Sequence, residues 1–78
     1  MSYGNTFFFQ KEKYVAFARE HRFTKKETEV GLLLANGFSN IRISEELYIS
    51  ITTVKKHITH IYEKSNIYCR KEFITYFL

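Results

Sequence analysis

The most constraining feature of this sequence is the spacing of aliphatic residues between Ser50 and Lys64. At about 100° per residue, an α-helix over this stretch places Val54, Ile58 and Ile61 on one side, with His57 at the edge. The opposite side collects polar residues, namely Thr52, Lys55, Lys56, Thr59 and Glu63. The pattern predicts an amphipathic helix that packs on a core through one side and presents two lysines on the other.

The size and composition of the chain favour one small helical domain. It has 78 residues and no proline, the strongest interrupter of helices. Its single cysteine, Cys69, excludes an intramolecular disulfide and a thiolate-only zinc site. Because the sequence has no apolar run of about 18 residues and no signal-peptide pattern, it favours a soluble intracellular protein. We therefore expect an all-α fold.

The distribution of charge suggests an anionic partner. The chain carries twelve basic and eight acidic residues, and residues 50–78 hold five of the basic and two of the acidic ones. Such an excess suits a nucleic acid, although it is also common in soluble proteins for solubility alone. The major groove of DNA is wide enough to admit an α-helix. The lysine-bearing helix is therefore expected to act as a recognition helix.

Capping residues predict where the other helices begin and end. Thr24 and Glu27 form the pattern of a capping box, so a helix should start at Lys25, and Gly37 should end it. Further cap residues are predicted at the starts of the next two helices and at the end of the long one, namely Ser39, Ser50 and Asn66. A last helix from Arg70 to Leu78 is too short to be stable alone in water, so it must dock on the domain or on a partner.

Two stretches allow more than one interpretation. A helix from about Phe7 to His21 would place Phe7, Tyr14, Phe17 and Ala18 on one side, widened by Phe8 and Val15. This side either packs across the core or contacts a second subunit. Gly31 lies inside a predicted helix, where it costs about 1 kcal/mol relative to alanine. Either another backbone approaches there, or the helix is weaker than it could be.

Three sequence blocks in order resemble the DNA-binding domain of LuxR/FixJ-type transcription regulators, over residues 23–74. The first block is Phe23-Thr24-Lys25-Lys26-Glu27-Thr28-Glu29-Val30. The second is Leu34-Ala35-Asn36-Gly37-Phe38-Ser39-Asn40-Ile41-Arg42-Ile43-Ser44. The third is Ile49-Ser50-Ile51-Thr52-Thr53-Val54-Lys55-Lys56-His57, followed by Ile61-Tyr62-Glu63-Lys64. Their spacing makes the resemblance specific.

The resemblance implies a four-helix LuxR-type helix-turn-helix domain over residues 23–78, preceded by an N-terminal helical extension over residues 1–22. In such a domain the third helix enters the major groove and the fourth forms a dimer. By position, the expected base-facing residues are Lys55, Lys56 and Thr59. The expected phosphate contacts are Asn40, Thr52, Thr53 and Lys64, to which His60 is added because it should contact a phosphate when protonated. The expected dimer residues are Phe73, Ile74 and Phe77.

The sequence departs from the family pattern at several positions. Gly31 stands where leucine is common, and Phe73 replaces a usually small residue of the dimer helix. Cys69 takes the place of a Ser or Asn cap, and a thiol is a poor acceptor. The 22 residues before Phe23 are too few for a receiver or ligand-binding domain.

We therefore expect a sequence-specific, double-stranded DNA-binding transcription regulator that acts as a homodimer in the bacterial cytoplasm, at the nucleoid. RNA polymerase is a further candidate partner. No enzyme, cofactor, metal site or membrane contact is expected, because the sequence lacks a catalytic constellation and His57 and His60 have no neighbouring thiol or acidic ligand. The alternative is a helix-turn-helix protein-interaction module that binds a regulator or RNA polymerase and contacts DNA little.

Overall fold

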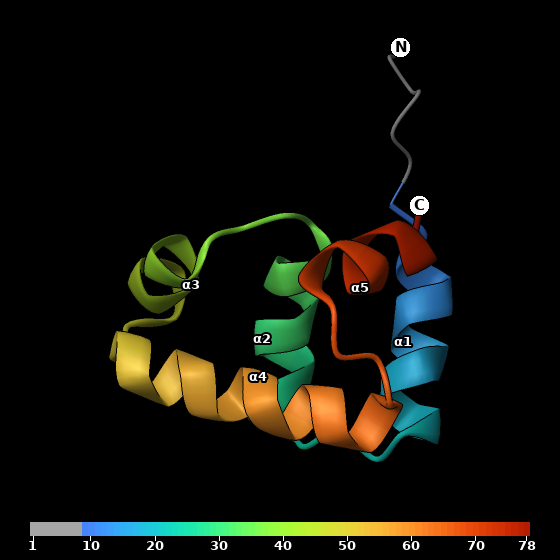
Figure 1. Cartoon of the computed structure of the whole chain (residues 1–78), viewed down its shortest axis with the longest axis horizontal. Coiled ribbons are helices and arrows are strands. Elements are labelled where there is room, and N and C mark those ends of the chain that lie inside the picture. Colours follow the sequence, from blue (N-terminus) through green and yellow to red (C-terminus); the bar gives the residue numbers. More distant parts are fainter. Residues whose placement is uncertain (1–8) are drawn as a thin grey trace, which may run out of the picture.

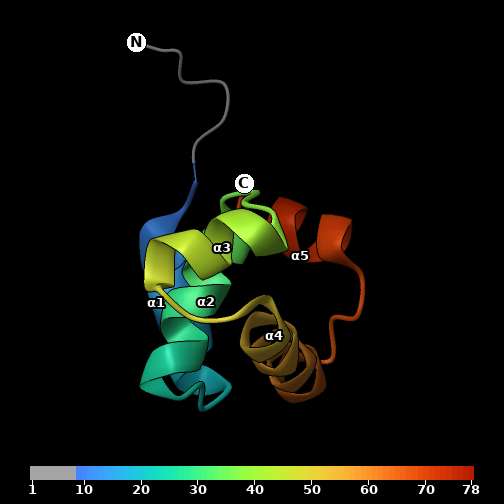
Figure 2. The same ribbon diagram turned by 90° about the vertical axis from the view of Figure 1, so that its left-hand side faces the viewer.

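The computed structural model describes residues 9–78, which form five α-helices and no strand (Figure 1). The predicted residues Phe7 and Phe8 lie outside the described part. The helices are α1 (Lys11–Glu20), α2 (Lys25–Ala35), α3 (Asn40–Leu47), α4 (Ile51–Ser65) and α5 (Arg70–Tyr76). In Figure 1, α4 runs along the lower edge, with α2 behind it and α3 and α5 above its two ends; Figure 2 shows α4 nearly end-on below α3. The all-α fold predicted from the sequence is confirmed.

The helix ends follow the local capping signals. Thr24 and Glu27 form the predicted capping box, in which Thr24 Oγ1 accepts from the Glu27 amide at 3.1 Å and Glu27 Oε1 accepts from the Thr24 amide at 2.9 Å. The Ser39 hydroxyl accepts from the Arg42 amide at 3.1 Å. Gly37 adopts a φ of +89° after α2, and the left-handed Asn66 ends α4. Cys69 precedes α5 without a side-chain cap, as its thiol predicts.

One apolar core joins all five helices. Its buried side chains include Tyr14 and Phe17 of α1, Leu34 of α2, Ile43 of α3 and Phe73 of α5. The first helix therefore packs across the core, which was one of the two interpretations of its aromatic side. Val15 was expected on the buried side but is 40% exposed, since α1 turns only the Tyr14–Phe17–Ala18 side inward.

Two of the three residues expected to form a dimer are buried within the chain itself. Phe73 and Phe77 each have no exposed surface. Phe17 of α1 lies edge-on to both rings, with centroid distances of 6.2 Å and 5.1 Å. Neither ring is therefore at the surface of the described chain, because α1 covers the side of α5 on which they lie. Ile74 is only partly buried, and it lines a cavity of about 450 Å³ with Phe9, Ala35, Asn36 and Leu78.

The start of α1 also satisfies the end of α5. The Gln10 amide donates to the Phe77 carbonyl at 2.7 Å, and the Lys13 ammonium donates to the Tyr76 carbonyl at 2.8 Å. The Gln10 side-chain amide donates to the Leu78 carbonyl as well. The last carbonyls of a helix have no partner within it, so these bonds stabilise a helix that is too short to persist alone.

Gly31 is explained by a side chain rather than by a neighbouring backbone. An added Cβ at this position would lie 2.3 Å from Tyr14 Oη, which is far inside van der Waals contact. The Tyr14 hydroxyl donates to the Thr28 carbonyl of α2 at 2.8 Å. The absent side chain of Gly31 therefore makes room for the phenol of α1. Burial also raises the pKa of Tyr14 well above its usual value.

No helix within residues 9–78 combines the length and the apolar character that crossing a membrane requires.

Candidate nucleic-acid interface

Helix α4 is held by its apolar side and by a capped first turn. Val54 and Ile61 are fully buried and Ile58 is 6% exposed, in agreement with the sequence pattern. The Ser50 hydroxyl accepts from the Thr53 amide at 3.0 Å, which satisfies one of the free donors of the first turn. The helix packs against α2 and α3. Its orientation is therefore fixed by the core, and its opposite side is left at the surface.

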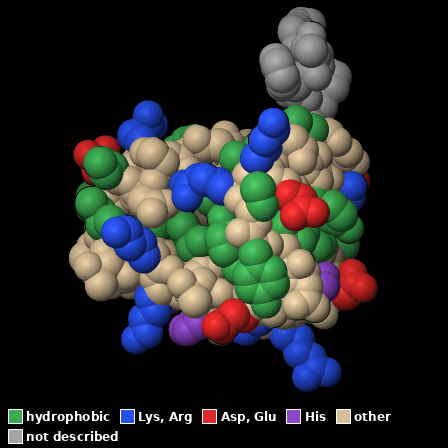
Figure 3. Space-filling view, in the orientation of Figure 1, with side chains coloured by type: hydrophobic (Ala, Val, Ile, Leu, Met, Phe, Trp, Pro, Cys, Tyr) green, Lys and Arg blue, Asp and Glu red, His purple; other side chains and the backbone are tan. Residues whose placement is uncertain are grey.

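The outer side of α4 carries the five predicted polar residues at helical spacing, all of them exposed, and the acidic Glu63 is the last of them. The four that precede Glu63 are Thr52, Lys55, Lys56 and Thr59, which we call the α4 outer face. Within residues 9–78, neither lysine forms an ion pair or a side-chain hydrogen bond. Ammonium groups in this state can donate to guanine O6 and N7 or to phosphate oxygens. Figure 3, in the orientation of Figure 1, shows basic side chains projecting from the lower edge, where α4 runs.

The remaining predicted contacts on α3 and at the start of α4 are less accessible. Asn40, the first residue of α3, is partly buried, and its Oδ1 is fully buried without a hydrogen-bond partner in the described region. Thr53 is also partly buried, and its hydroxyl accepts from Ser50 Oγ at 2.9 Å. His57, which the helical period places at the edge of the apolar side, likewise has a buried Nδ1 that lacks a partner among residues 9–78.

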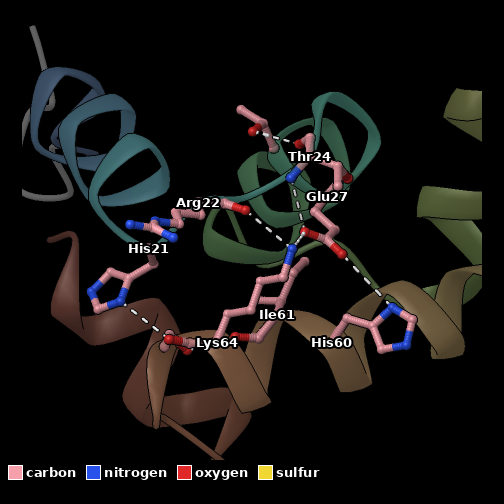
Figure 4. Close-up of polar contacts among 9 residues, drawn as sticks. His21, Arg22, Thr24, Glu27, His60, Ile61 and Lys64 are labelled. Carbon is pink, nitrogen blue, oxygen red and sulfur yellow. Dashed lines mark hydrogen bonds and ion pairs between the residues drawn. The ribbon is translucent and has the colours of Figure 1, made fainter.

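Lys64 and His60 point toward the protein rather than along the α4 outer face (Figure 4). The Lys64 ammonium donates to Glu27 Oε1 at 2.6 Å and to the Arg22 carbonyl at 3.1 Å. His60 Nδ1 lies 3.7 Å from Glu27 Oε2. Lys64 was expected to contact phosphate, but in the described structure its charge already has an internal partner.

Glu27 is the residue of this region whose importance the sequence did not reveal. Its first role, closing the capping box, was predicted from its spacing to Thr24. Its carboxylate is also buried, at 4% exposure, and neutralises Lys64 across 37 positions of the chain. Burial alone would raise the pKa of Glu27. The hydrogen bonds from Lys64 and Thr24 and the charge of Lys64 lower this pKa by more than burial raises it, so that it lies below its usual value.

This ion pair ties the end of α4 to the connection between α1 and α2. His21 Nδ1 lies 3.2 Å from the Lys64 carbonyl, and Arg22, whose carbonyl accepts from Lys64, has a left-handed φ of 58°. Both contacts join residues more than 40 positions apart. The sequence holds one signal for this pair: Glu27 belongs to the first block that resembles the family and Lys64 to the third. Only that could have suggested that Glu27 and Lys64 meet.

Residues 21–77 match the family described as bacterial regulatory proteins, luxR family. The chain is similar to the oxygen regulatory protein NreC of Staphylococcus carnosus (strain TM300), with 40% identity over 55 residues that cover 70% of this chain and 25% of that protein. It is also similar to the transcriptional regulatory protein LiaR of Bacillus subtilis (strain 168), with 45% identity over 53 residues, 68% of this chain and 25% of that protein. A third relative is the HTH-type transcriptional regulator MalT of Vibrio campbellii (strain ATCC BAA-1116), with 47% identity over 51 residues, 65% of this chain and 6% of that protein.

The chain thus matches a quarter or less of the length of these regulators. No solved structure matches it. The relatives are regulatory proteins and not enzymes, in agreement with the expectation from the sequence. The match begins after the end of α1 at Glu20 and therefore excludes this helix entirely.

Proposed function

Because this chain belongs to the luxR family of bacterial regulatory proteins, we propose that it regulates transcription by inserting α4 into the major groove of double-stranded DNA. The observation that carries this proposal is the α4 outer face. Its two lysines are exposed and form no ion pair within residues 9–78, and the core fixes the helix that presents them. A DNA-binding role would place the protein at the nucleoid in the bacterial cytoplasm.

The dimensions and polarity of α4 suit this role. Its 15 residues span roughly 22 Å at 1.5 Å per residue, and a helix with its side chains fits a groove about 12 Å wide. At the capped start of α4 the helix dipole favours an anionic partner. Lys55 and Lys56 follow one turn later. We assign these two residues to bases, Thr52 and Thr53 to phosphates, and Asn40 to a phosphate near the start of α3.

We further propose that the protein binds as a homodimer, through the surface of α5 that α1 leaves open. The residues on this surface are Lys71, Thr75 and Leu78, which are all exposed and lie opposite the buried Phe73 and Phe77. This assignment replaces the two buried rings with exposed residues of α5 and of the segment that directly follows it. A symmetric pair would place two α4 helices on half-sites about one turn of DNA apart.

A protein-interaction module remains the second candidate, and exposed apolar residues at the start of α3 and directly after its end favour it. Tyr48 is 94% exposed and Ile41 is 57% exposed. Surface of this kind can contact a regulator or RNA polymerase, since exposed aromatic residues are enriched at interfaces. Under this alternative the α4 outer face would contribute little to binding.

Titration of random duplex DNA, followed by fluorescence anisotropy at several salt concentrations, separates the two candidates. A DNA-binding protein should lose affinity steeply as salt rises, because each phosphate contact adds about −0.9 to the slope of log K against log salt. Binding that is weak and independent of salt would favour the interaction module. Selection from a random DNA pool should then yield a two-fold symmetric motif.

Substitution of the two lysines tests their assignment to bases. In Lys55→Gln and Lys56→Gln, the preference for the selected motif over random DNA should fall by about 1–3 kcal/mol. If the contact is only to phosphate, affinity should fall evenly across sequences and the salt slope should shrink by about 1. Lys11→Gln is the matched control, because Lys11 is exposed on α1 and should leave both quantities nearly unchanged.

A further inference from the structure

The three threonines of α4 differ in whether their hydroxyl groups donate a hydrogen bond within the protein. The Thr59 hydroxyl donates to the carbonyl of Lys55, four residues earlier in the same helix, at 3.0 Å. Thr53 accepts from Ser50 Oγ, so its own proton remains available. Thr52 forms no side-chain hydrogen bond within residues 9–78. The hydroxyl donor of Thr59 is therefore the one used inside the helix.

This internal bond determines which group of Thr59 is presented outward. A threonine in a helix commonly folds its hydroxyl back to the carbonyl three or four residues before it. The other substituent of Cβ, the γ-methyl group, then remains free to contact a partner. Thr59 is exposed and belongs to the α4 outer face, one turn beyond Lys55. Its accessible surface is thus an apolar methyl group beside two ammonium groups.

We propose that Thr59 is a specificity-determining residue that recognises the 5-methyl group of thymine in the major groove. In that groove, thymine is the base that presents a methyl group, and contact with apolar side-chain atoms distinguishes it. The proton used for Lys55 is not available to donate to guanine or to phosphate, so toward a thymine, whose O4 is itself an acceptor, the methyl contact is the interaction that remains. This inference rests on the proposed function, because it requires α4 to lie in the major groove.

The test uses the DNA sequence that the wild-type protein selects from a random pool. Each thymine in a half-site is replaced in turn by deoxyuridine, which removes the methyl group and leaves base pairing and the O4 acceptor intact. Loss of one buried methyl contact should weaken binding about fourfold at one thymine in each half-site. The dissociation constants are measured by anisotropy.

Two variants of Thr59 identify the atom responsible. Thr59→Val keeps a methyl group and removes the hydroxyl, so the variant should retain the fourfold difference between thymine and uracil. Thr59→Ser keeps the hydroxyl and removes the methyl group, so this variant should bind both DNAs equally. Circular dichroism melting verifies that both variants fold, as expected for substitutions at an exposed position.

The outcomes separate this inference from the function on which it rests. A selected sequence in which every uracil substitution is neutral would overturn the role of Thr59 and leave DNA binding intact. The same holds if Thr59→Ser retains the difference or Thr59→Val loses it, since the methyl group of Thr59 would then not be the group that distinguishes thymine from uracil. Failure to select any preferred sequence would instead overturn sequence-specific binding itself.

Discussion

At Gly31, the phenol of Tyr14 occupies the space in which any larger residue would place its first side-chain carbon. Tyr14 is 1% exposed and is hydrogen-bonded to Thr28, so its ring cannot move aside without loss of packing. The sequence marked Gly31 as a departure from the family pattern. The cause lies in α1, which precedes the part that matches the family. Gly31 and Tyr14 are therefore expected to depend on each other.

We expect Gly31→Ala to destabilise the protein by about 1–3 kcal/mol, because overpacking a core exceeds the gain of about 1 kcal/mol in helix propensity. In a Tyr14→Phe background the hydroxyl is absent, and the same substitution should cost at least 1 kcal/mol less. The free energies of unfolding in urea for the four proteins give the coupling directly. Additive effects, or a stabilising Gly31→Ala in the wild type, would show that the Tyr14 hydroxyl does not restrict this position.

The buried carboxylate of Glu27 should make stability depend on pH. Because its pKa in the folded protein lies below the ordinary value, its contribution is fully present above that value and is lost as pH falls through the lowered pKa. At neutral pH, Glu27→Gln should be less stable than the wild type by about 2 kcal/mol. This is less than a fully buried pair would lose, since the Lys64 side chain is 33% exposed.

The difference between the wild type and Glu27→Gln should shrink as pH falls below about 4, when the carboxylate becomes protonated. Urea unfolding at a series of pH values measures it. Glu29→Gln is the matched control, because Glu29 pairs with Lys26 at the surface and should contribute at most 1 kcal/mol. A constant difference over this pH range would contradict the role assigned to the Glu27 charge.

At the scale of helices, α1 and α5 stabilise each other. The residues before and within the first turn of α1 bind the last carbonyls of α5, and Phe17 covers the two phenylalanines of α5. As a result, the helix predicted to dimerise buries Phe73 and leaves Lys71, Glu72, Thr75 and Tyr76 exposed.

If this surface forms the dimer, Thr75→Arg should weaken association at least tenfold, because it adds a charge next to Lys71 at the two-fold contact. Sedimentation velocity over a range of protein concentrations measures the monomer–dimer equilibrium. Ala16→Arg introduces the same charge at an exposed position of α1 and serves as the control. Equal effects of the two variants, or none, would assign the dimer to another surface.

For the molecule as a whole, the features that depend on nearby residues could be predicted from the sequence. The caps at Thr24, Ser39 and Ser50 involve partners three residues away, and the α4 outer face follows from the helical period. The placement of Phe73 and Lys64 could not be predicted in this way. Each depends on a contact between distant segments, with α1 in one case and Glu27 in the other.

The hydrogen bonds between Gln10 and the last two residues have a practical consequence for experiments. They bring the beginning and the end of the described chain together, on the side of the molecule away from α4 (Figures 1 and 2). A fluorophore or surface tether joined through a linker at the exposed Gln10 would therefore leave the protein on the side away from α4, and outside the α5 surface proposed for the dimer. Such an attachment allows single-molecule and immobilised binding assays that leave α4, the helix proposed to enter the groove, unobstructed.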